Sequence, residues 1–513
     1  MIRRAVQPLI NLLARPWARL AAACSGLGYG RTVGVVTALG AAIRIAGLAR
    51  QPLGYDEDFT ALVVHQPLGR MFDIVSRDSA PPLFYALERL IVAAADVFGL
   101  AGWGGPGGPV VLRVVPALAG IAAIPLIAAL ARRVGGNSAG LWAALFAALV
   151  PTAVMLSGFV RMYGLGATLT VASALLLWRA VDKSTTVRWL TYFAAAATAA
   201  WTDYFCVIAL AGIVAAALWL RRGRRVSALA IATTTAAVAT LAPWLLVAQA
   251  QFQHAGQGFW VPPLSFSMIG GTYCQLFMGP PIDWAIPFGL PLVGLQFAAV
   301  LAGSAALAYA AVAWRQLPAD GRRGAIYLLI ASGGVAILAI VSIWRPVLDA
   351  RYAGVMWLPL FALAGVGLAA MPRRYATLLL LAVTVPTLAL STVTTHRQTS
   401  ELVPELDARV GTHDLAAAAW DHYLILLDET SPAVQSRLHV LSTTGLPWYV
   451  GTAAYPEGAA IDTIPADVIA GHGRIFWIAD PGVPAPVLPA GYRQNEVSCA
   501  IEVCLTIYEP PAG

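Results

Sequence analysis

The sequence predicts a multi-span α-helical membrane protein of about 11 transmembrane helices, followed by a small C-terminal α/β domain. Of the 513 residues, 59% are hydrophobic and only 12% are charged, about half the charged share of a typical soluble protein. Apolar segments recur at the length of about 17–25 residues that a helix needs to cross a bilayer. After about residue 395, polar residues and short β-like runs replace these segments.

The predicted spans are the long apolar stretches between the basic loops. They cover about 32–49, 109–131, 138–157, 164–181, 187–202, 204–220, 227–249, 285–313, 325–344, 352–371 and 375–394. Residues 1–31 are basic with scattered apolar positions, which predicts a cytoplasmic amphipathic segment on the membrane surface rather than a signal peptide. The spans and their loops define a transmembrane domain over 32–395.

Arginine pairs set the predicted orientation. With the N-terminus in the cytoplasm, alternating spans place every pair on the cytoplasmic side. The net charge of +7 is therefore explained by short cytoplasmic loops beside a lipid bilayer, and we expect no nucleic-acid partner. The pairs are Arg132-Arg133, Arg221-Arg222, Arg224-Arg225, Arg322-Arg323 and Arg373-Arg374.

The same orientation places the long loops outside the cytoplasm. These are the first outer loop at 50–108, a second at 250–284, and all of 396–513. Long loops in compact proteins usually carry function, so we expect the active site on the outer face of the cytoplasmic membrane. Within the first loop, 80–100 is too polar to span and predicts an interfacial amphipathic helix.

The tail over 396–513 predicts an extracytoplasmic soluble α/β domain. Its β-like runs are 437–442, 474–479 and 504–509, and 421–429 has a helical pattern. Cys499 and Cys504 lie close together in this tail, and outside the cytoplasm such a pair favours a disulfide. The other cysteines, Cys24, Cys206 and Cys274, are interpreted as buried thiols.

The stretch GYDEDFT at 54–60 contains three consecutive carboxylates, Asp56, Glu57 and Asp58. A solvated loop is the simplest interpretation. The alternatives are a general base, because crowded like charges raise one another's pKa, or a Mg²⁺ or Mn²⁺ site with oxygen ligands at Asp56 and Glu57. No cysteine–histidine cluster has zinc spacing.

Other ionisable groups lie at the outer ends of later spans, where charge is costly and usually partnered or functional. Arginine binds phosphate well. At the membrane surface, the arginines among these groups would bind a lipid phosphate, and a carboxylate beside it could deprotonate the hydroxyl of an acceptor. This combination indicates glycosyl transfer from a polyprenyl-phosphate sugar. The groups are Arg161, Tyr163, Asp203, Tyr204, Arg345, Asp349, Arg351 and Tyr352.

Four short motifs in order resemble the GT-C superfamily of membrane glycosyltransferases. The likeness is to the protein O-mannosyltransferase and aminoarabinose transferase branch, especially its actinobacterial relatives. The motifs are YDEDF, DSAPPLFY at 78–85, RMYGL at 161–165 and RPVLDARY at 345–352, and the resemblance covers about 32–370. Three positions depart from the family pattern: Ala80 and Asp203 stand where histidines are common, and Phe159 where a glutamate is frequent.

The resemblance implies roles for these residues. Asp56 takes the place of the catalytic acid-base residue, with Glu57 beside it, whereas Asp58 has no counterpart and is interpreted as a loop cap. Donor phosphate and substrate binding are expected from Asp78, Arg161, Tyr163, Asp203, Arg345, Arg351 and Tyr352.

The expected function is an inverting glycosyltransferase that moves a sugar from a polyprenyl-phosphate donor to a glycolipid, polysaccharide or protein acceptor. Mannose is the favoured sugar and arabinose the alternative. A transporter or flippase is the competing class, but no inverted repeat or broken mid-membrane helix is evident in the sequence. A catalytically inactive binding subunit is a third alternative, against which the intact Asp56-Glu57 pair argues.

Overall fold

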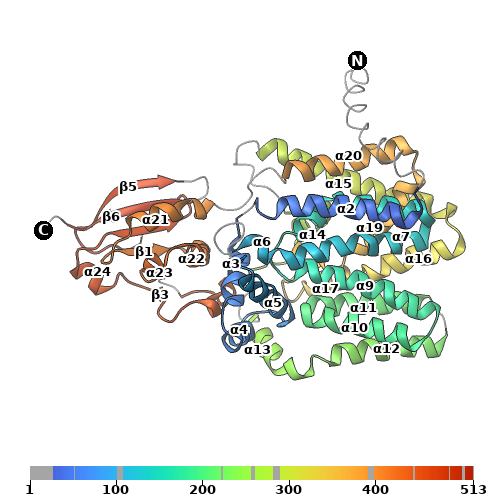
Figure 1. The fold of residues 1–513 in the computed structure, drawn as a ribbon, viewed down its shortest axis with the longest axis horizontal. Helices are drawn as coiled ribbons and strands as arrows, with labels where there is room; N and C mark the ends of the chain where they lie inside the picture. Colours follow the sequence, from blue (N-terminus) through green and yellow to red (C-terminus); the bar gives the residue numbers. More distant parts are fainter. Residues whose placement is uncertain are drawn as a thin grey trace, which may run out of the picture.

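The computed structural model describes residues 27–50, 52–100, 108–220, 223–255, 260–280, 289–390, 398–442, 445–484, 486–499 and 503–511. A helical bundle forms one end of the molecule and an α/β domain forms the other (Figure 1). Most of the predicted amphipathic segment 1–31, together with Cys24, lies outside the described residues. The chain is thus a helical membrane protein with a separate C-terminal sheet region.

Each of the eleven predicted spans overlaps at least one helix of the bundle. Among the described residues, five helices are long and apolar enough to cross a bilayer, or six if the two helices bent by 41° near 240 form one span. The number of spans and their orientation therefore stay predictions. The bundle helices are α2 (Tyr29–Gly47), α7 (Val114–Leu149), α8 (Pro151–Leu156), α9 (Tyr163–Asp182), α10 (Thr186–Thr202), α11 (Tyr204–Trp219), α12 (Arg224–Ala239), α13 (Leu245–Ala255), α14 (Phe266–Met278), α15 (Gly289–Val312), α16 (Ala319–Ala331), α17 (Gly334–Val341), α18 (Ala350–Gly354), α19 (Leu358–Ala370) and α20 (Arg373–Leu390).

The segment labelled α7 contains two helical arms that meet at a sharp break. Its 36 residues would extend about 54 Å as one helix, well beyond the apolar thickness of a bilayer. The helical dihedrals break at Gly135 and Gly136, and Gly136 has a φ of 75°. Because that left-handed conformation suits glycine, the Gly-Gly pair separates the two predicted spans at the loop that carries Arg132 and Arg133.

Arg44 of α2 is buried within the bundle, with 3% of its surface exposed. Its guanidinium donates to the carbonyl oxygens of Ala147 and Ala148 at 3.2 and 3.1 Å and to the Ser157 hydroxyl at 2.9 Å. These carbonyls belong to the last turn of α7, where intrahelical partners run out. Arg44 therefore joins α2 to the α7–α8 break and needs no carboxylate partner in this role.

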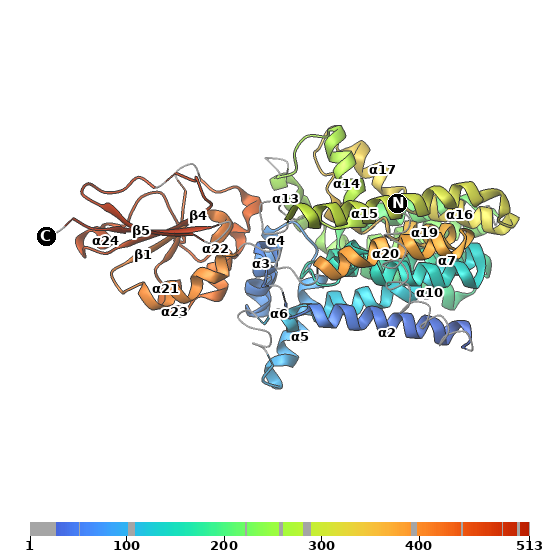
Figure 2. The same cartoon turned by 90° about the horizontal axis from the view of Figure 1, so that it is seen from above.

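The described residues of the loop predicted at 50–108 fold into short helices between the bundle and the tail (Figure 2). They are α3 (Tyr55–Val64), α4 (Leu68–Arg77) and α5 (Leu83–Val97), and α6 (Pro109–Leu112) follows at the start of the next predicted span. Helix α5 confirms the helix predicted over 80–100. The acidic stretch is not an open loop, because its three carboxylates form the first turn of α3, where the helix dipole favours negative charge.

The tail forms a six-stranded sheet in the order β3-β2-β1-β4-β6-β5. Strands β3, β2, β1 and β4 are mutually parallel, and β6 and β5 continue the sheet antiparallel. A disulfide joins Cys499 to Cys504, which pair across the β5–β6 hairpin. The elements are α21 (Val403–Arg409), β1 (Leu415–Ala418), α22 (Trp420–Glu429), α23 (Pro432–Gln435), β2 (Leu438–Leu441), β3 (Ala460–Ile461), α24 (Ala466–Ala470), β4 (Ile475–Ala479), β5 (Arg493–Cys499) and β6 (Cys504–Glu509).

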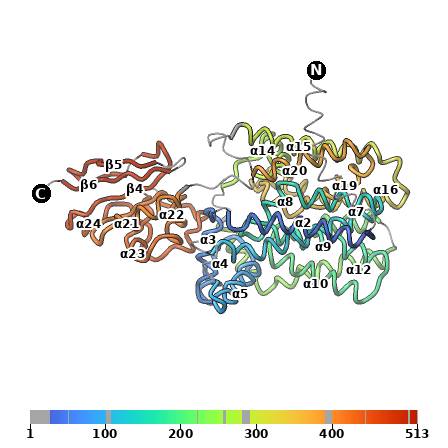
Figure 3. The backbone as a smooth tube through the Cα atoms, turned by 45° about the horizontal axis from the view of Figure 1, so that its top comes forward, coloured from blue at the N-terminus to red at the C-terminus, as the bar shows by residue number. Residues whose placement is uncertain are grey.

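The tail contacts the rest of the chain mainly through α22, which packs on α3 (Figure 3). The rings of Tyr55 and Trp420 meet edge to face with centroids 5.8 Å apart. The Tyr55 hydroxyl donates to the Val450 carbonyl oxygen and lies 3.2 Å from the Tyr455 hydroxyl. The tail therefore contacts Tyr55, the residue that immediately precedes Asp56.

Candidate active site

Asp56 and Arg351 meet at the end of the bundle that faces the tail. Asp56 lies in the first turn of α3 and accepts a hydrogen bond from the Arg351 guanidinium. Arg351 belongs to α18, which Asp349 caps by accepting from the Arg351 amide at 2.8 Å. The guanidinium also lies over the Trp260 ring, 4.8 Å from its centroid. Three segments distant in sequence therefore fix one ion pair.

This ion pair is open to its surroundings and borders a cavity of about 560 Å³. The side chains of Asp56 and Arg351 are 37% and 43% exposed. Most of the cavity wall is apolar and comes from α2, α8, the end of α14 and α20. A mainly apolar cavity that is bordered by an ion pair fits an amphiphile with a polar head. Further charged residues also line the cavity, namely Arg44, Arg50, Glu57, Arg113 and Asp349. Its apolar lining includes Ile43, Leu48, Val154, Met155, Leu156, Phe159, Trp357 and Leu390.

Glu57 points into the protein, and its side chain is 1% exposed. One carboxylate oxygen accepts from the Gly54 amide at 3.0 Å, as in a capping box, and the other accepts from the Val160 amide at 3.0 Å. Arg113 lies 3.4 Å from the same carboxylate. Glu57 thus ties the start of α3 to the turn before Arg161, and the sequence interpretation had not included Arg113.

Asp58 is fully buried, and neither of its carboxylate oxygens has a hydrogen-bond partner among the described residues. The interpretation of Asp58 as a loop cap is wrong, because Glu57 provides the cap. Burial raises the pKa of Asp58 well above its usual value, and Asp428 and Glu429 of α22 raise that pKa further. Asp58 therefore belongs to the contact between α3 and the tail.

The buried Arg161 and Tyr85 and the half-buried Asp78 form a cluster behind α3. The Arg161 guanidinium donates to the Tyr85 hydroxyl at 3.1 Å, and that hydroxyl donates to Asp78 at 3.2 Å. Arg161 also lies 5.6 Å from the centroid of the Phe59 ring. Burial raises the pKa of Asp78, while Arg161 opposes the shift. None of these four residues lines the cavity, so they support α3 from behind.

Tyr163 and Tyr352 contribute to an aromatic wall. Tyr163 stacks on Phe159, and Tyr352 stacks on Phe205 with centroids 4.3 Å apart. The Tyr352 hydroxyl accepts from the Trp260 indole N–H at 3.2 Å. This wall positions Trp260 beside Arg351.

Asp203 and Arg345 lie apart from the ion pair. Asp203 caps α11 by accepting from the Phe205 amide at 2.9 Å, and its second oxygen is buried. Arg345 follows α17 and is exposed. Neither residue lines the cavity. The structure therefore brings Asp56 and Arg351 together and gives no such contact to Arg345.

The acidic turn does not offer a joint metal site. Asp56 faces Arg351, while Glu57 is engaged by Arg113 and two amides. Among the described residues, one group of three metal-ligating side chains was found, and it lies in the tail. The two carboxylates thus have separate partners and do not face a common ligand position.

Comparisons with known proteins concern the fold and part of the sequence. Residues 90–247 match the family described as dolichyl-phosphate-mannose-protein mannosyltransferase. The structure resembles ArnT from Cupriavidus metallidurans bound to undecaprenyl phosphate, with a TM-score of 0.57 and 16% identity over 93% of this chain and 97% of that one.

The apo form of that protein gives a TM-score of 0.58 with the same identity and coverage. The apo Archaeoglobus fulgidus oligosaccharyltransferase gives a TM-score of 0.51 and 14% identity, over 79% of this chain and 64% of that one. No curated protein sequence matches the chain.

Proposed function

Because this chain has the GT-C fold of membrane glycosyltransferases, we propose that it transfers a sugar from a polyprenyl-phosphate donor to a cell-envelope acceptor. The observation that carries the proposal is the Asp56–Arg351 pair at the border of a mainly apolar cavity. A polyprenyl chain fits the apolar wall, and a phosphate fits the guanidinium. The matched ArnT structure was solved with a lipid phosphate, undecaprenyl phosphate.

The ion pair suggests how donor binding prepares the base. Asp56 and a donor phosphate are both anions that compete for the Arg351 guanidinium. When the phosphate takes the guanidinium, the Asp56 carboxylate loses its partner beside the sugar and becomes available to accept a proton. The capping contacts of Glu57 hold the α3 turn in place during this exchange. Donor binding and base activation are thereby coupled through one arginine.

The transfer itself is a single displacement at the anomeric carbon. The acceptor oxygen forms a bond to that carbon while the bond from the carbon to the phosphate oxygen breaks. The hydroxyl proton passes to Asp56, and the electron pair leaves with the polyprenyl phosphate, whose charge Arg351 stabilises. Direct attack from the opposite side inverts the configuration. Mannose is the proposed sugar, since the matched family description names a mannosyl donor, and arabinose is the alternative.

The site is proposed to work on the outer face of the cytoplasmic membrane. The motivation is the arginine pattern, which assigns the loops beside α3 and the tail to the extracytoplasmic side. The tail covers α3 next to the base, so it is positioned to guide an acceptor. A glycolipid, a polysaccharide and a protein remain the acceptor classes.

The test uses purified protein in liposomes with radiolabelled polyprenyl-phosphate mannose or arabinose and a cell-envelope extract as acceptor. We expect label in the acceptor with inverted anomeric configuration from one donor. Movement of intact donor across the bilayer without cleavage of the sugar–phosphate bond would identify a flippase instead. If the protein binds the donor but neither transfers the sugar nor moves the donor across the bilayer, it is a catalytically inactive binding subunit. The donor that supports transfer identifies the sugar.

A further inference from the structure

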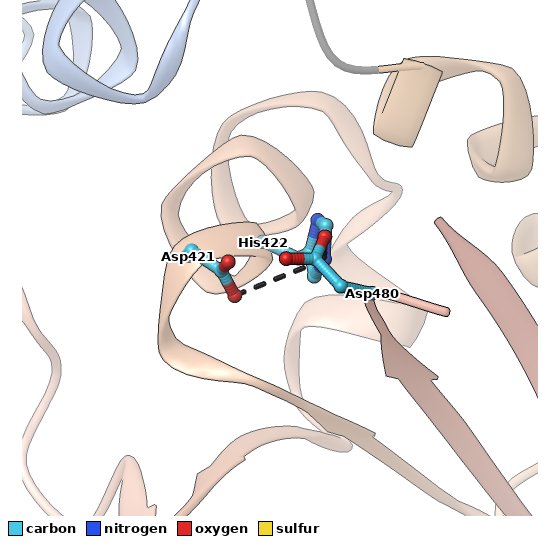
Figure 4. A group of neighbouring side chains, drawn as sticks. All are labelled: Asp421, His422 and Asp480. Carbon is cyan, nitrogen blue, oxygen red and sulfur yellow. Dashed lines mark ion pairs between the residues drawn. The ribbon is translucent and has the colours of Figure 1, made fainter. Parts of the chain in front are cut away.

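We propose that the tail holds a divalent transition-metal cation, such as Zn²⁺ or Mn²⁺, between Asp421, His422 and Asp480. These side chains point toward one another from the start of α22 and the end of β4 (Figure 4). One ligand atom from each lies within 4.8 Å of the others. The proposal does not depend on the glycosyltransferase function, because it concerns a site in a different domain.

The spacing of the ligand atoms suits a small divalent cation. The His422 Nε2 atom is 3.2 Å from an Asp480 oxygen and 3.8 Å from an Asp421 oxygen. Two ligand atoms bound tetrahedrally to Zn²⁺ at about 2.1 Å are about 3.4 Å apart. A cation among the three groups needs only small side-chain shifts. One imidazole and two carboxylates form a donor set that suits Zn²⁺ or Mn²⁺ and leaves further positions for water or a ligand.

The second ring nitrogen of His422 is already oriented for this role. His422 is fully buried, and its Nδ1 atom is 2.8 Å from the buried Thr399 hydroxyl. If Nδ1–H donates to that oxygen, Nε2 presents its lone pair to the two carboxylates. Metal-binding histidines usually donate their other N–H to a fixed acceptor in this way. Thr399 therefore favours the tautomer and ring orientation that a ligand requires.

The place of the cluster in the sheet also favours a ligand site. Strands β1 and β4 are adjacent and parallel, whereas β2 and β3 lie on the other side of β1. Successive strands are therefore added to one side of β1 up to β3, and the chain then crosses to the other side of β1 to form β4. In open α/β sheets, ligands bind outside the carboxyl ends of the strands at such a switch point. Asp421 and His422 follow β1, and Asp480 follows β4.

The occupied site would stabilise the first turn of α22, the helix that contacts α3. Trp420, next to Asp421, packs on Tyr55, which precedes Asp56. The competing arrangement is a protonated His422 held between the two carboxylates, which needs no cation. The two arrangements differ in whether the protein takes up metal.

The test measures metal uptake by the full-length protein in detergent, purified without a polyhistidine tag and stripped with a chelator. We expect one Zn²⁺ or Mn²⁺ per chain by equilibrium dialysis and elemental analysis, and a melting temperature that rises with the metal. Asp480→Asn should weaken binding at least tenfold and abolish the rise. Asp480 suits this test because its side chain is 35% exposed, so the variant should fold.

Two control variants distinguish metal binding at this site from metal binding by other carboxylates. Asp467→Asn changes a 70% exposed residue of the same domain and should bind metal like the unmodified chain. Asp56→Asn should also retain one cation. The proposal is overturned if the unmodified chain takes up neither metal at millimolar concentration, if Asp480→Asn binds as well as Asp467→Asn, or if the cation disappears with Asp56→Asn.

Discussion

The Asp56 carboxylate accepts a hydrogen bond from the Arg351 guanidinium across a sequence separation of 295 residues. In the proposed reaction this contact breaks when a donor phosphate binds, so that Asp56 becomes the base and Arg351 the phosphate ligand. Substitution of Asp56 is therefore expected to lower turnover, whereas substitution of Arg351 is expected to weaken donor binding.

Asp56→Asn should lower turnover by about 10²–10⁴-fold, the usual range for loss of a general base. Donor affinity should stay the same or rise, because the competing anion at Arg351 is removed. Single-turnover transfer and donor binding, measured on the same preparation, check both effects. Wild-type turnover in this variant would eliminate Asp56 as the base.

Arg351→Ala should weaken donor binding by about ten- to a hundredfold, equivalent to the roughly 1.5–3 kcal/mol of one charge-assisted contact. Arg351→Lys should restore part of this, since an ammonium lacks the guanidinium fork. The matched comparison is Arg161→Ala, whose guanidinium is buried against Tyr85. That variant should lose thermal stability more than donor affinity. A larger loss of donor affinity in Arg161→Ala than in Arg351→Ala would assign the phosphate to Arg161. The sequence motifs are consistent with either arginine as the phosphate ligand.

Glu57→Gln should act mainly on folding. The change leaves the Arg113 charge buried without its carboxylate, and breaking buried pairs typically costs about 3–5 kcal/mol. Arg113 keeps its contacts to the carbonyl oxygens of Leu48 and Pro52, so we expect the lower end of that range. Thermal unfolding in detergent measures it, and Glu57→Gln combined with Arg113→Met should recover part of the loss. If Glu57→Gln abolishes turnover without changing the melting temperature, Glu57 is a catalytic residue.

Docking of the tail should weaken as pH rises from about 4 to about 7. Burial raises the pKa of Asp428 to about 7. Burial also raises the pKa of Glu429 to about 7, and the neighbouring Asp428 adds to that shift. The buried Asp58 of α3 faces both, with Arg113 as the opposing charge, and the nearby Ser400 lowers the pKa of Glu429.

Because these carboxyls bind more protons folded than unfolded in that window, the free energy of unfolding falls as pH rises through it. Limited proteolysis of the tail across pH checks this expectation. Asp428→Asn should flatten the profile, and a profile that rises with pH would contradict the argument.

Membrane topology can be tested by labelling in intact cells. Gly69→Cys in α4 and Glu457→Cys in the tail are both exposed positions, and the proposed orientation expects both to react with an impermeant thiol reagent. Ala319→Cys, at the start of α16, should react only after permeabilisation. Reaction of only one of the first two would mean that the span count is in error by one.

The sequence determined which segments are helical and apolar, because hydrophobic length is a local property that membrane burial enforces. It also determined the α/β character of the tail and the motif order typical of the GT-C fold. These features are confirmed by the helices, by the sheet and by the matched structures. The three acidic residues were recognisable as unusual in an apolar chain.

Only the tertiary structure decided how those three neighbours differ. Consecutive residues on a helix point in directions about 100° apart, so Asp56 faces Arg351, Glu57 faces Arg113, and Asp58 faces the tail. Their partners come from distant segments that no local pattern connects. The same holds for Asp480, which comes close to the adjacent Asp421 and His422 because β1 and β4 pair in parallel. Composition and periodicity fix the elements, whereas a site requires contacts that the packing of those elements creates.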